Sequence, residues 1–99
     1  MQTLEALGQL FGAYFHQDWD LDNSDEWEVL ESFMRTEPRR ARMLPDEIDS
    51  VLSTIDTEEQ LKSLVIDQLG AYYLADVDGG TYRAWLQEIA DRVRAATAG

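Results

Sequence analysis

Apolar residues in this chain of 99 residues recur at intervals of three and four, and this spacing constrains the fold more than any other feature. Because an α-helix completes a turn every 3.6 residues, such a spacing places apolar side chains along one helix face. The stripes are Leu4, Leu7, Leu10, Phe11, Tyr14 and Phe15; Trp27, Leu30, Phe33 and Met34; Ile48, Val51, Leu52 and Ile55; Leu61, Leu64, Val65 and Leu69; and Tyr82, Trp85, Leu86, Ile89 and Val93. We therefore predict an all-α fold, a compact single-domain bundle of about five to six short helices over residues 1–99.

Capping residues and prolines indicate where these helices begin. The expected starts are Asn23, Pro38, Thr57 and Thr81. Pro45 either interrupts the helix that begins at Pro38 or begins another one, because proline disrupts a helix interior. Gly70 is expected to end its helix in a left-handed turn. The segment 17–23 breaks the helical pattern, and 71–75 is either extended or a continuing turn.

The net charge of −12 excludes some classes of partner and leaves others open. Phosphates of DNA or RNA and the surface of an anionic membrane would repel this chain, so we expect neither nucleic acid nor membrane as a partner. A basic protein, a cation, or simply a very soluble surface all remain compatible with the charge.

The N-terminus has no basic residue ahead of a continuous apolar run, so no signal peptide is expected. No stretch of about 18 uninterrupted apolar residues is present to span a membrane. The absence of cysteine fits a reducing cytosol. We expect the protein to be cytoplasmic.

Acidic residues crowd one short region before and within the second predicted helix. Residues 1–34 contain no Lys or Arg, and the acidic residues of the run are Asp18, Asp20, Asp22, Asp25, Glu26, Glu28 and Glu31. The helix dipole favours anions in or near a first turn, which accounts for Asp25, Glu26 and Glu28. It does not account for the three aspartates that precede the predicted helix, Asp18, Asp20 and Asp22. Arg35, Arg39, Arg40 and Arg42 follow the run and are available to pair with it.

A calcium site is one alternative for the acidic run. With Asp20 as position one of an EF-hand loop, Glu31 falls at position twelve. Position six, however, is Asp25 where a glycine normally allows the sharp turn, and no second loop is found in the sequence. A calcium-binding module or a protein-interaction adaptor stays the alternative function.

Catalytic residues are scarce. His16 is the only histidine, cysteine is absent, and no serine lies in a Gly-x-Ser-x-Gly setting. One histidine is too few for a zinc site, and a histidine beside aromatic residues is usually structural. We expect no enzyme activity, no metal site and no cofactor. Tyr72 and Tyr73 are adjacent, so at least one of them is expected to be exposed, where it could anchor a partner.

Two segments resemble a known family of bacterial immunity proteins. They are Leu10–Trp19 (LFGAYFHQDW) and Asp78–Leu86 (DGGTYRAWL), and the resemblance covers most of the chain. The family belongs to contact-dependent growth inhibition (CDI) systems. The resemblance implies a cytoplasmic helical protein that binds a toxin domain delivered by a neighbouring bacterium and blocks its active site. At least some toxins paired with this family look like ribonucleases of the pancreatic type.

The resemblance and the charge together give an expected toxin-binding set. A nuclease has a basic cleft, and an acidic protein can occupy that cleft in place of phosphate. The expected partner-binding residues are Asp18, Asp20, Asp22, Asp25, Glu28, Tyr72, Asp76 and Asp78. The partner is expected to be a basic toxin domain, a ribonuclease, and the free protein a monomer or a weak dimer.

Overall fold

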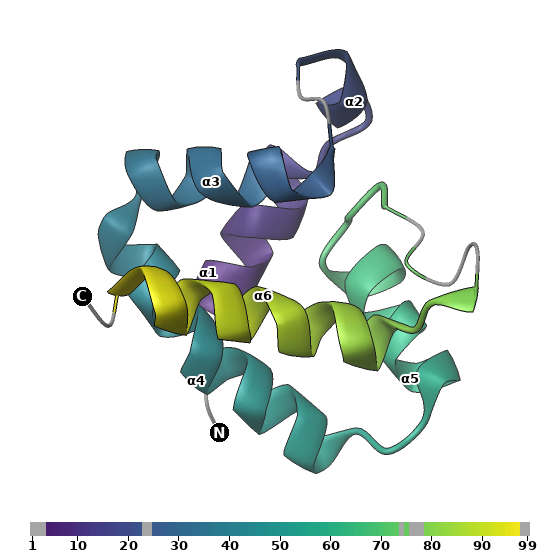
Figure 1. Ribbon diagram of the computed structural model, residues 1–99. Helices are drawn as coiled ribbons and strands as arrows, with labels where there is room; N and C mark the ends of the chain where they lie inside the picture. Colours follow the sequence, from purple (N-terminus) through teal and green to yellow (C-terminus); the bar gives the residue numbers. More distant parts are fainter. Residues whose placement is uncertain (1–3, 23–24, 74, 76–78, 98–99) are drawn as a thin grey trace.

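The computed structural model describes residues 4–22, 25–73, 75 and 79–97, and every regular element in this part of the chain is helical (Figure 1). The elements are α1 (Glu5–Gln9), η1 (Leu10–Tyr14), α2 (Trp19–Asp22), α3 (Glu26–Thr36), α4 (Pro38–Thr54), α5 (Glu58–Lys62), η2 (Ser63–Gln68) and α6 (Tyr82–Thr97). The two η elements are π-helical and directly continue α1 and α5, so the described residues form six helical segments. The predicted all-α fold is confirmed.

Helices α4 and α6 lie at the centre of the fold. In Figure 1, α6 crosses the middle of the molecule, with α3 on one side of it and α4 on the other. α6 packs against α4 and α5, and α4 also packs against α1 and α3. The predicted stripes meet between these helices, and the largest fully buried side chains are Tyr82, Phe11, Phe15, Phe33, Leu7, Leu10, Leu30, Leu44, Ile48, Leu61, Leu86 and Ile89. The radius of gyration is 12.5 Å, close to the value of about 13 Å for a compact domain of this size.

Several predicted helix ends are confirmed by their hydrogen bonds. Thr57 accepts a bond from the N–H of Gln60 at 3.2 Å, and Thr81 accepts one from Ala84 at 3.0 Å. Gly70 has a φ of +79°, the left-handed turn expected after the helix. Such a turn costs glycine little, because glycine has no Cβ to clash with the backbone.

The prediction that Pro45 ends or begins a helix is wrong. α4 runs without a break from Pro38 to Thr54, with Pro45 buried inside it. Pro45 has no N–H to donate to the carbonyl four residues earlier, so the helix lacks one bond there. The apolar face of α4 is buried on both sides of this position, at Leu44 and Ile48, and this packing holds the helix together across the gap.

The region between the first two predicted helices also differs from the prediction. Trp19–Asp22 forms one short helix, α2, where the sequence indicated a break in the pattern. α3 begins at Glu26 and is capped by Asp25, whose carboxylate accepts a bond from the N–H of Glu28 at 2.9 Å. The predicted cap at Asn23 lies outside the described residues.

The two π-helical segments were not predicted, because apolar spacing does not distinguish a π-turn from an α-turn. Phe15 donates its N–H to the carbonyl of Leu10 at 3.0 Å, and Leu69 donates to Leu64 at 2.8 Å, both spanning five residues. The two segments come close to each other, since a Cβ on Gly12 would lie 3.6 Å from the carbonyl oxygen of Leu69. The chain therefore leaves η2 beside η1, and this places residues 70–73 next to the first helix.

A buried glutamate connects α4 to the start of α1. Glu47 has no exposed surface, and its two carboxylate oxygens accept bonds from the N–H groups of Ala6 and Leu7 at 3.0 and 2.9 Å. The first N–H groups of a helix have no partner within the helix. Glu47 supplies that partner from 40 residues away, so a charged side chain in the core completes the N-terminus of α1.

A second glutamate does the same at the start of α6. Glu58 accepts bonds from the N–H groups of Tyr82 at 2.6 Å and Arg83 at 3.0 Å. The guanidinium of Arg83 in turn donates to the carbonyls of Leu52 at 3.2 Å and Ile55 at 2.5 Å, at the end of α4. These bonds connect three helices, α4, α5 and α6, at one end of the molecule.

Candidate functional site

The expected partner-binding residues come from three places in the chain. Asp18 precedes α2 and Asp20 lies within it. Asp25 and Glu28 lie at the start of α3, and Tyr72 lies in the segment after Gly70. Asp22 is the last residue of α2, but its side chain is not described. Asp76 and Asp78 lie outside the described residues.

Helix α2 forms a projection at one corner of the molecule, beyond the N-terminal end of α3 (Figure 1). Two backbone bonds shape this turn, from the N–H of Trp19 to the carbonyl of His16 and from Leu21 to Asp18, each at 3.0 Å. The Nδ1 atom of His16 accepts a bond from the N–H of Asp18 at 3.0 Å. His16 thus has the structural role expected from the sequence, stabilising the start of α2.

One side-chain bond connects this projection to the expected anchor. Nε1 of Trp19 donates to the carbonyl oxygen of Tyr72 at 3.0 Å, across 53 residues of sequence. The N–H of Tyr72 donates to the carbonyl of Phe15 at 2.9 Å. Both backbone groups of Tyr72 are therefore used to hold it against the first helix and α2.

The inner side of this junction is a cluster of aromatic rings. Trp19 packs edge-on against Phe15 and Tyr73, with both pairs of ring centroids 5.7 Å apart. Tyr73 also packs against Trp85 of α6, with centroids 4.5 Å apart. Such contacts stabilise a core beyond simple burial, so α2 is fixed to the core through Trp19.

The outer side of the junction exposes apolar surface. Leu21 is 78% exposed and Tyr72 is 61% exposed, and these two are the exposed large apolar side chains within the described ranges. Asp18 and Asp20 beside them are also exposed. We call this surface the α2 face and define it as Asp18, Asp20, Leu21 and Tyr72. The expected exposure of one tyrosine of the 72–73 pair is confirmed, whereas Leu21 was not among the expected residues.

Glu28 lies in a polar recess of about 460 Å³ between η1 and α3. The recess is lined by Ala13, Tyr14, His16, Glu28, Val29, Ser32 and Arg35. Glu28 thus shares its surroundings with a cation, Arg35, which the sequence offered only as a possible partner of the acidic run. Asp25 is the exposed cap of α3, and in the sequence it lies between α2 and Glu28.

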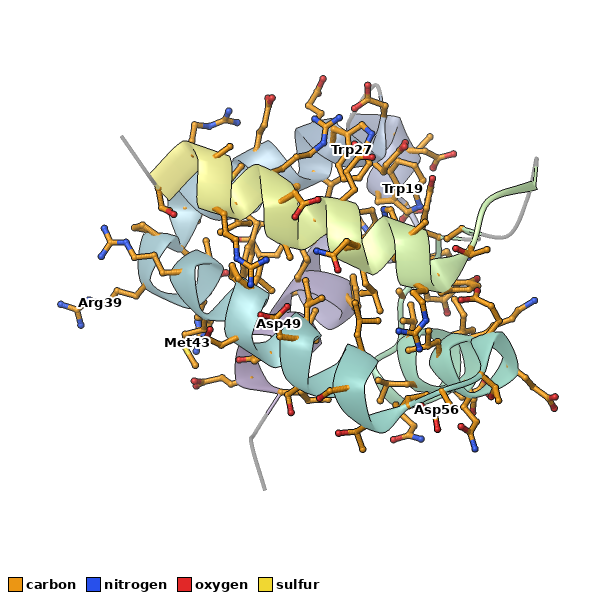
Figure 2. The ribbon with its side chains drawn as sticks, turned by 60° about the horizontal axis from the view of Figure 1, so that its bottom comes forward. Trp19, Trp27, Arg39, Met43, Asp49 and Asp56 are labelled. Atoms are coloured by element: carbon orange, nitrogen blue, oxygen red, sulfur yellow. The ribbon has the colours of Figure 1, made fainter. Side chains whose placement is uncertain are left out.

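The ion pairs that the structure shows for Arg40, Arg92 and Arg94 are with carboxylates outside the acidic run. The guanidinium of Arg92 also lies 4.0 Å from the ring centroid of Trp27 on α3. Arg40 pairs with Glu37 and, at 3.7 Å, with Glu5. Arg94 pairs with Asp49 at 2.5 Å. In Figure 2, Arg39 extends from the side of the ribbon opposite to Trp19. In the part of the chain that the structure describes, the ion pairs of Arg40 are therefore not with the acidic run, to which the sequence offered it as a possible partner, and Asp18 and Asp20 form no ion pair.

A polar network around Glu37 joins the first helix to the junction of α3 and α4. Hydrogen bonds from Tyr14 and then Arg40 lower the pKa of Glu37, and Gln9 donates to the same carboxylate at 3.2 Å. Burial, followed by the bond to Glu37, raises the pKa of Tyr14. The carboxylate of Glu37 thus bonds side chains of α1, η1 and α4.

The arrangement gives no support to a calcium site. Asp20 lies in helical α2, and the carboxylate of Asp25 is bonded to the backbone of α3. Within the described ranges, no three His, Cys, Asp or Glu side chains come together as ligands for a metal ion. In the same part of the chain, no helix is long and apolar enough to cross a lipid bilayer.

Comparisons with known proteins agree with the fold and the sequence pattern. A family model described as CdiI immunity protein matches residues 3–93. The fold is similar to that of a chain in the crystal structure of a CdiA-CT/CdiI complex from Y. kristensenii 33638, with a TM-score of 0.82 and 22% sequence identity. The match covers 90% of this chain and 96% of that chain. No curated protein matches the chain.

Proposed function

The chain belongs to the CdiI immunity protein family, and from this premise we propose that it neutralises the nuclease toxin of its own CDI system by covering a basic active site. The proposed action is stoichiometric occupation of the toxin, with no chemistry performed by this chain. A cognate toxin domain is the proposed partner, in the cytoplasm that the toxin enters.

The separation of charge is the observation that supports this proposal. Residues 1–34 contain no Lys or Arg, and the carboxylates of Asp18 and Asp20 are exposed on a projecting helix. The ion pairs of Arg40 and Arg94 lie elsewhere. Because a nuclease must attract phosphate, its cleft carries positive potential, and an exposed anionic surface can compete for that cleft. Charge complementarity also accelerates capture, which suits a protein that must act before the toxin does.

Inhibition by the purified proteins tests the proposal. The toxin domain encoded beside this chain is incubated with labelled RNA and with DNA, and this protein is titrated into each reaction. We expect cleavage to stop at one equivalent, with nanomolar affinity or tighter. Absence of binding, or binding to a toxin that cleaves neither nucleic acid, would overturn the proposed function.

Competition distinguishes active-site coverage from binding elsewhere on the toxin. A non-hydrolysable oligonucleotide is first bound to the toxin, and the association rate of this protein is then measured. We expect the oligonucleotide to slow association in proportion to its occupancy. An unchanged rate would show that the protein binds outside the cleft.

Charge variants test how the toxin is captured. Asp18→Asn with Asp20→Asn is expected to slow association by about three- to tenfold at low salt, with the difference shrinking as salt screens the charges. Asp46→Asn with Asp67→Asn removes the same charge from exposed positions on α4 and η2 and serves as the control. Equal slowing by both pairs would show that net charge, and not the α2 face, attracts the toxin.

A further inference from the structure

Resting on the proposed function, we infer that Leu21 and Tyr72 are the apolar anchors of the toxin-binding surface. The toxin surface they fit would be an apolar recess bordered by Lys and Arg side chains. The α2 face, rather than the acidic run as a whole, would then form the centre of the interface.

Exposure of these two side chains contrasts with the rest of the apolar residues. Leu21 and Tyr72 are 78% and 61% exposed, while the other large apolar side chains described are buried or packed against the core. Single exposed apolar residues are ordinary. Here the two belong to segments that are far apart in sequence, and the side chain of Trp19 bonds these segments together, so the fold itself brings the two segments to one junction.

The structure also holds the backbone of both anchors in place through hydrogen bonds. Trp19 points inward to Phe15 and Tyr73, and Leu21 follows two residues later, which on a helix places it on roughly the opposite side. The N–H and carbonyl of Tyr72 are both bonded, to Phe15 and Trp19. A backbone that is already held in place loses little conformational entropy on binding, and tyrosine is among the residues that most often dominate interfaces.

An apolar groove lies beside the tyrosine. It has a volume of about 380 Å³ and is lined by Ile66, Gly70, Ala71 and Tyr72. The left-handed turn at Gly70 directs the chain out of η2 at this point. A side chain of the toxin that packs on Tyr72 would therefore enter a recess, and not rest on a flat surface, which favours tight packing around the anchor.

Charge determines the occupant that we assign to this face. Asp18 and Asp20 precede Leu21 on the projecting turn and are exposed. A second copy of this chain, with a net charge of −12, would bring like charges together around the apolar contact. A basic partner would instead neutralise them, so the surface fits the proposed toxin better than it fits self-association.

Affinity measurements with truncated anchors test the inference. We expect Tyr72→Ala to weaken binding to the purified toxin domain by about 30-fold and Leu21→Ala by about tenfold, chiefly through faster dissociation. Both side chains are exposed, so the melting temperature of the free variants should stay near that of the wild type. Tyr72→Phe and Leu21→Met keep the apolar anchor and should bind within about threefold of wild type. Arg39→Ala, on the opposite side (Figure 2), is the control and should not change binding.

A double-mutant cycle separates the anchor from the residue that positions it. Trp19→Phe removes the indole N–H that holds the Tyr72 carbonyl while retaining an aromatic ring in the cluster. We expect it to weaken toxin binding in the wild-type background and to add little in the Tyr72→Ala background. Fully additive losses would contradict a positioning role for Trp19.

The failure of this inference differs from the failure of the proposed function. If the wild type inhibits the toxin and the two alanine variants bind within about twofold of it, the centre of the interface lies elsewhere and only this inference fails. If the wild type does not bind the toxin, the proposed function fails as well. Sedimentation of the free protein tests whether a second copy of this chain binds the α2 face instead. A dimer that dissociates in Leu21→Ala or Tyr72→Ala would make the α2 face a self-association surface and overturn the inference.

Discussion

Glu47 in the core and Asp20 on α2 carry the same kind of charge in opposite surroundings. Glu47 is fully buried, and both its oxygens accept backbone N–H bonds at the start of α1. Asp20 is exposed on a projecting turn. The net charge of −12 is therefore not a single property of the molecule. Part of it completes helix ends inside the fold, and part of it faces solvent, where a partner can meet it.

Glu58 and Glu37 lie between these extremes. Glu58 bonds two N–H groups of α6 as Glu47 does for α1, but from an exposed position. Glu37 bonds side chains of neighbouring segments, and these bonds lower its pKa. If burial and bonding set the contribution of each carboxylate, replacing it should lower the free energy of unfolding most for Glu47, less for Glu58 and less again for Glu37. Replacing Asp18 and Asp20 should lower it least.

Glu47 should show the largest effect. Glu47→Ala leaves two buried N–H donors without partners, at about 1–3 kcal/mol each, so the free energy of unfolding should fall by about 2–6 kcal/mol. Glu47→Gln retains one acceptor oxygen and should cost roughly half as much. Urea unfolding followed by circular dichroism measures both, with the exposed neighbour Asp46→Asn as the control. A loss below about 0.5 kcal/mol for Glu47→Gln would show that the buried bonds contribute little.

Glu58 should show a smaller effect for the same pair of bonds. Water can reach the start of α6 in Glu58→Ala, so the loss should resemble that of an ordinary helix cap, about 0.5–2 kcal/mol. The same unfolding measurement applies, and Glu59→Gln, exposed one residue later, is the matched control. Equal losses for Glu58→Ala and Glu47→Ala would mean that burial does not set the cost.

The contribution of Glu37 to stability should depend on pH. Bonds from Tyr14 and Arg40 lower its pKa in the folded protein below the usual value near 4.5. A lowered pKa means that the stabilisation is complete above pH 4.5 and is lost as the pH falls through the folded-state pKa. Unfolding midpoints measured from neutral pH down to about pH 3 should therefore converge between wild type and Glu37→Gln. Parallel curves would show that Glu37 contributes no acid-dependent stability.

The α2 aspartates should show the smallest effect on stability. Asp18→Asn with Asp20→Asn removes exposed charges, so the free energy of unfolding should stay within about 0.5 kcal/mol of the wild type. Differential scanning calorimetry of the free protein is a sufficient measurement. A clear stabilisation would show self-repulsion among the carboxylates, and a clear destabilisation would place them among the folding charges.

The sequence was sufficient for the longer helices and for the starts near Pro38, Thr57 and Thr81, but not for the short helix α2. Helical spacing identified the buried faces, and local capping by Thr57 and Thr81 follows from side chains three residues away. The prediction for Pro45 was wrong, because the tendency of proline to break a helix was outweighed by the burial of the apolar residues on both sides of it. The π-turns give no signal in apolar spacing.

The spacing of apolar residues could not predict the polar contacts between residues far apart in the sequence. Glu47 is one polar residue among others on α4, and nothing local shows that its partners lie 40 residues earlier. The exposure of Tyr72 was predictable in part, because adjacent tyrosines point in different directions. Leu21 could have been found: it stands between aspartates and belongs to none of the apolar stripes. That its segment meets the segment of Tyr72 depends on the Trp19 bond, which only the folded structure reveals.

The hydrogen bonds that the structure shows for Tyr72 are made by its backbone: its N–H donates to the carbonyl of Phe15, and its carbonyl accepts from the indole of Trp19. Any residue with a backbone N–H can make both of these bonds, so the side chain at position 72 can change while the scaffold stays as it is. An immunity protein built in this way could acquire a different toxin specificity by single substitutions at this position. Recognition would then evolve at almost no cost to folding, whereas a change at Trp19 would alter both.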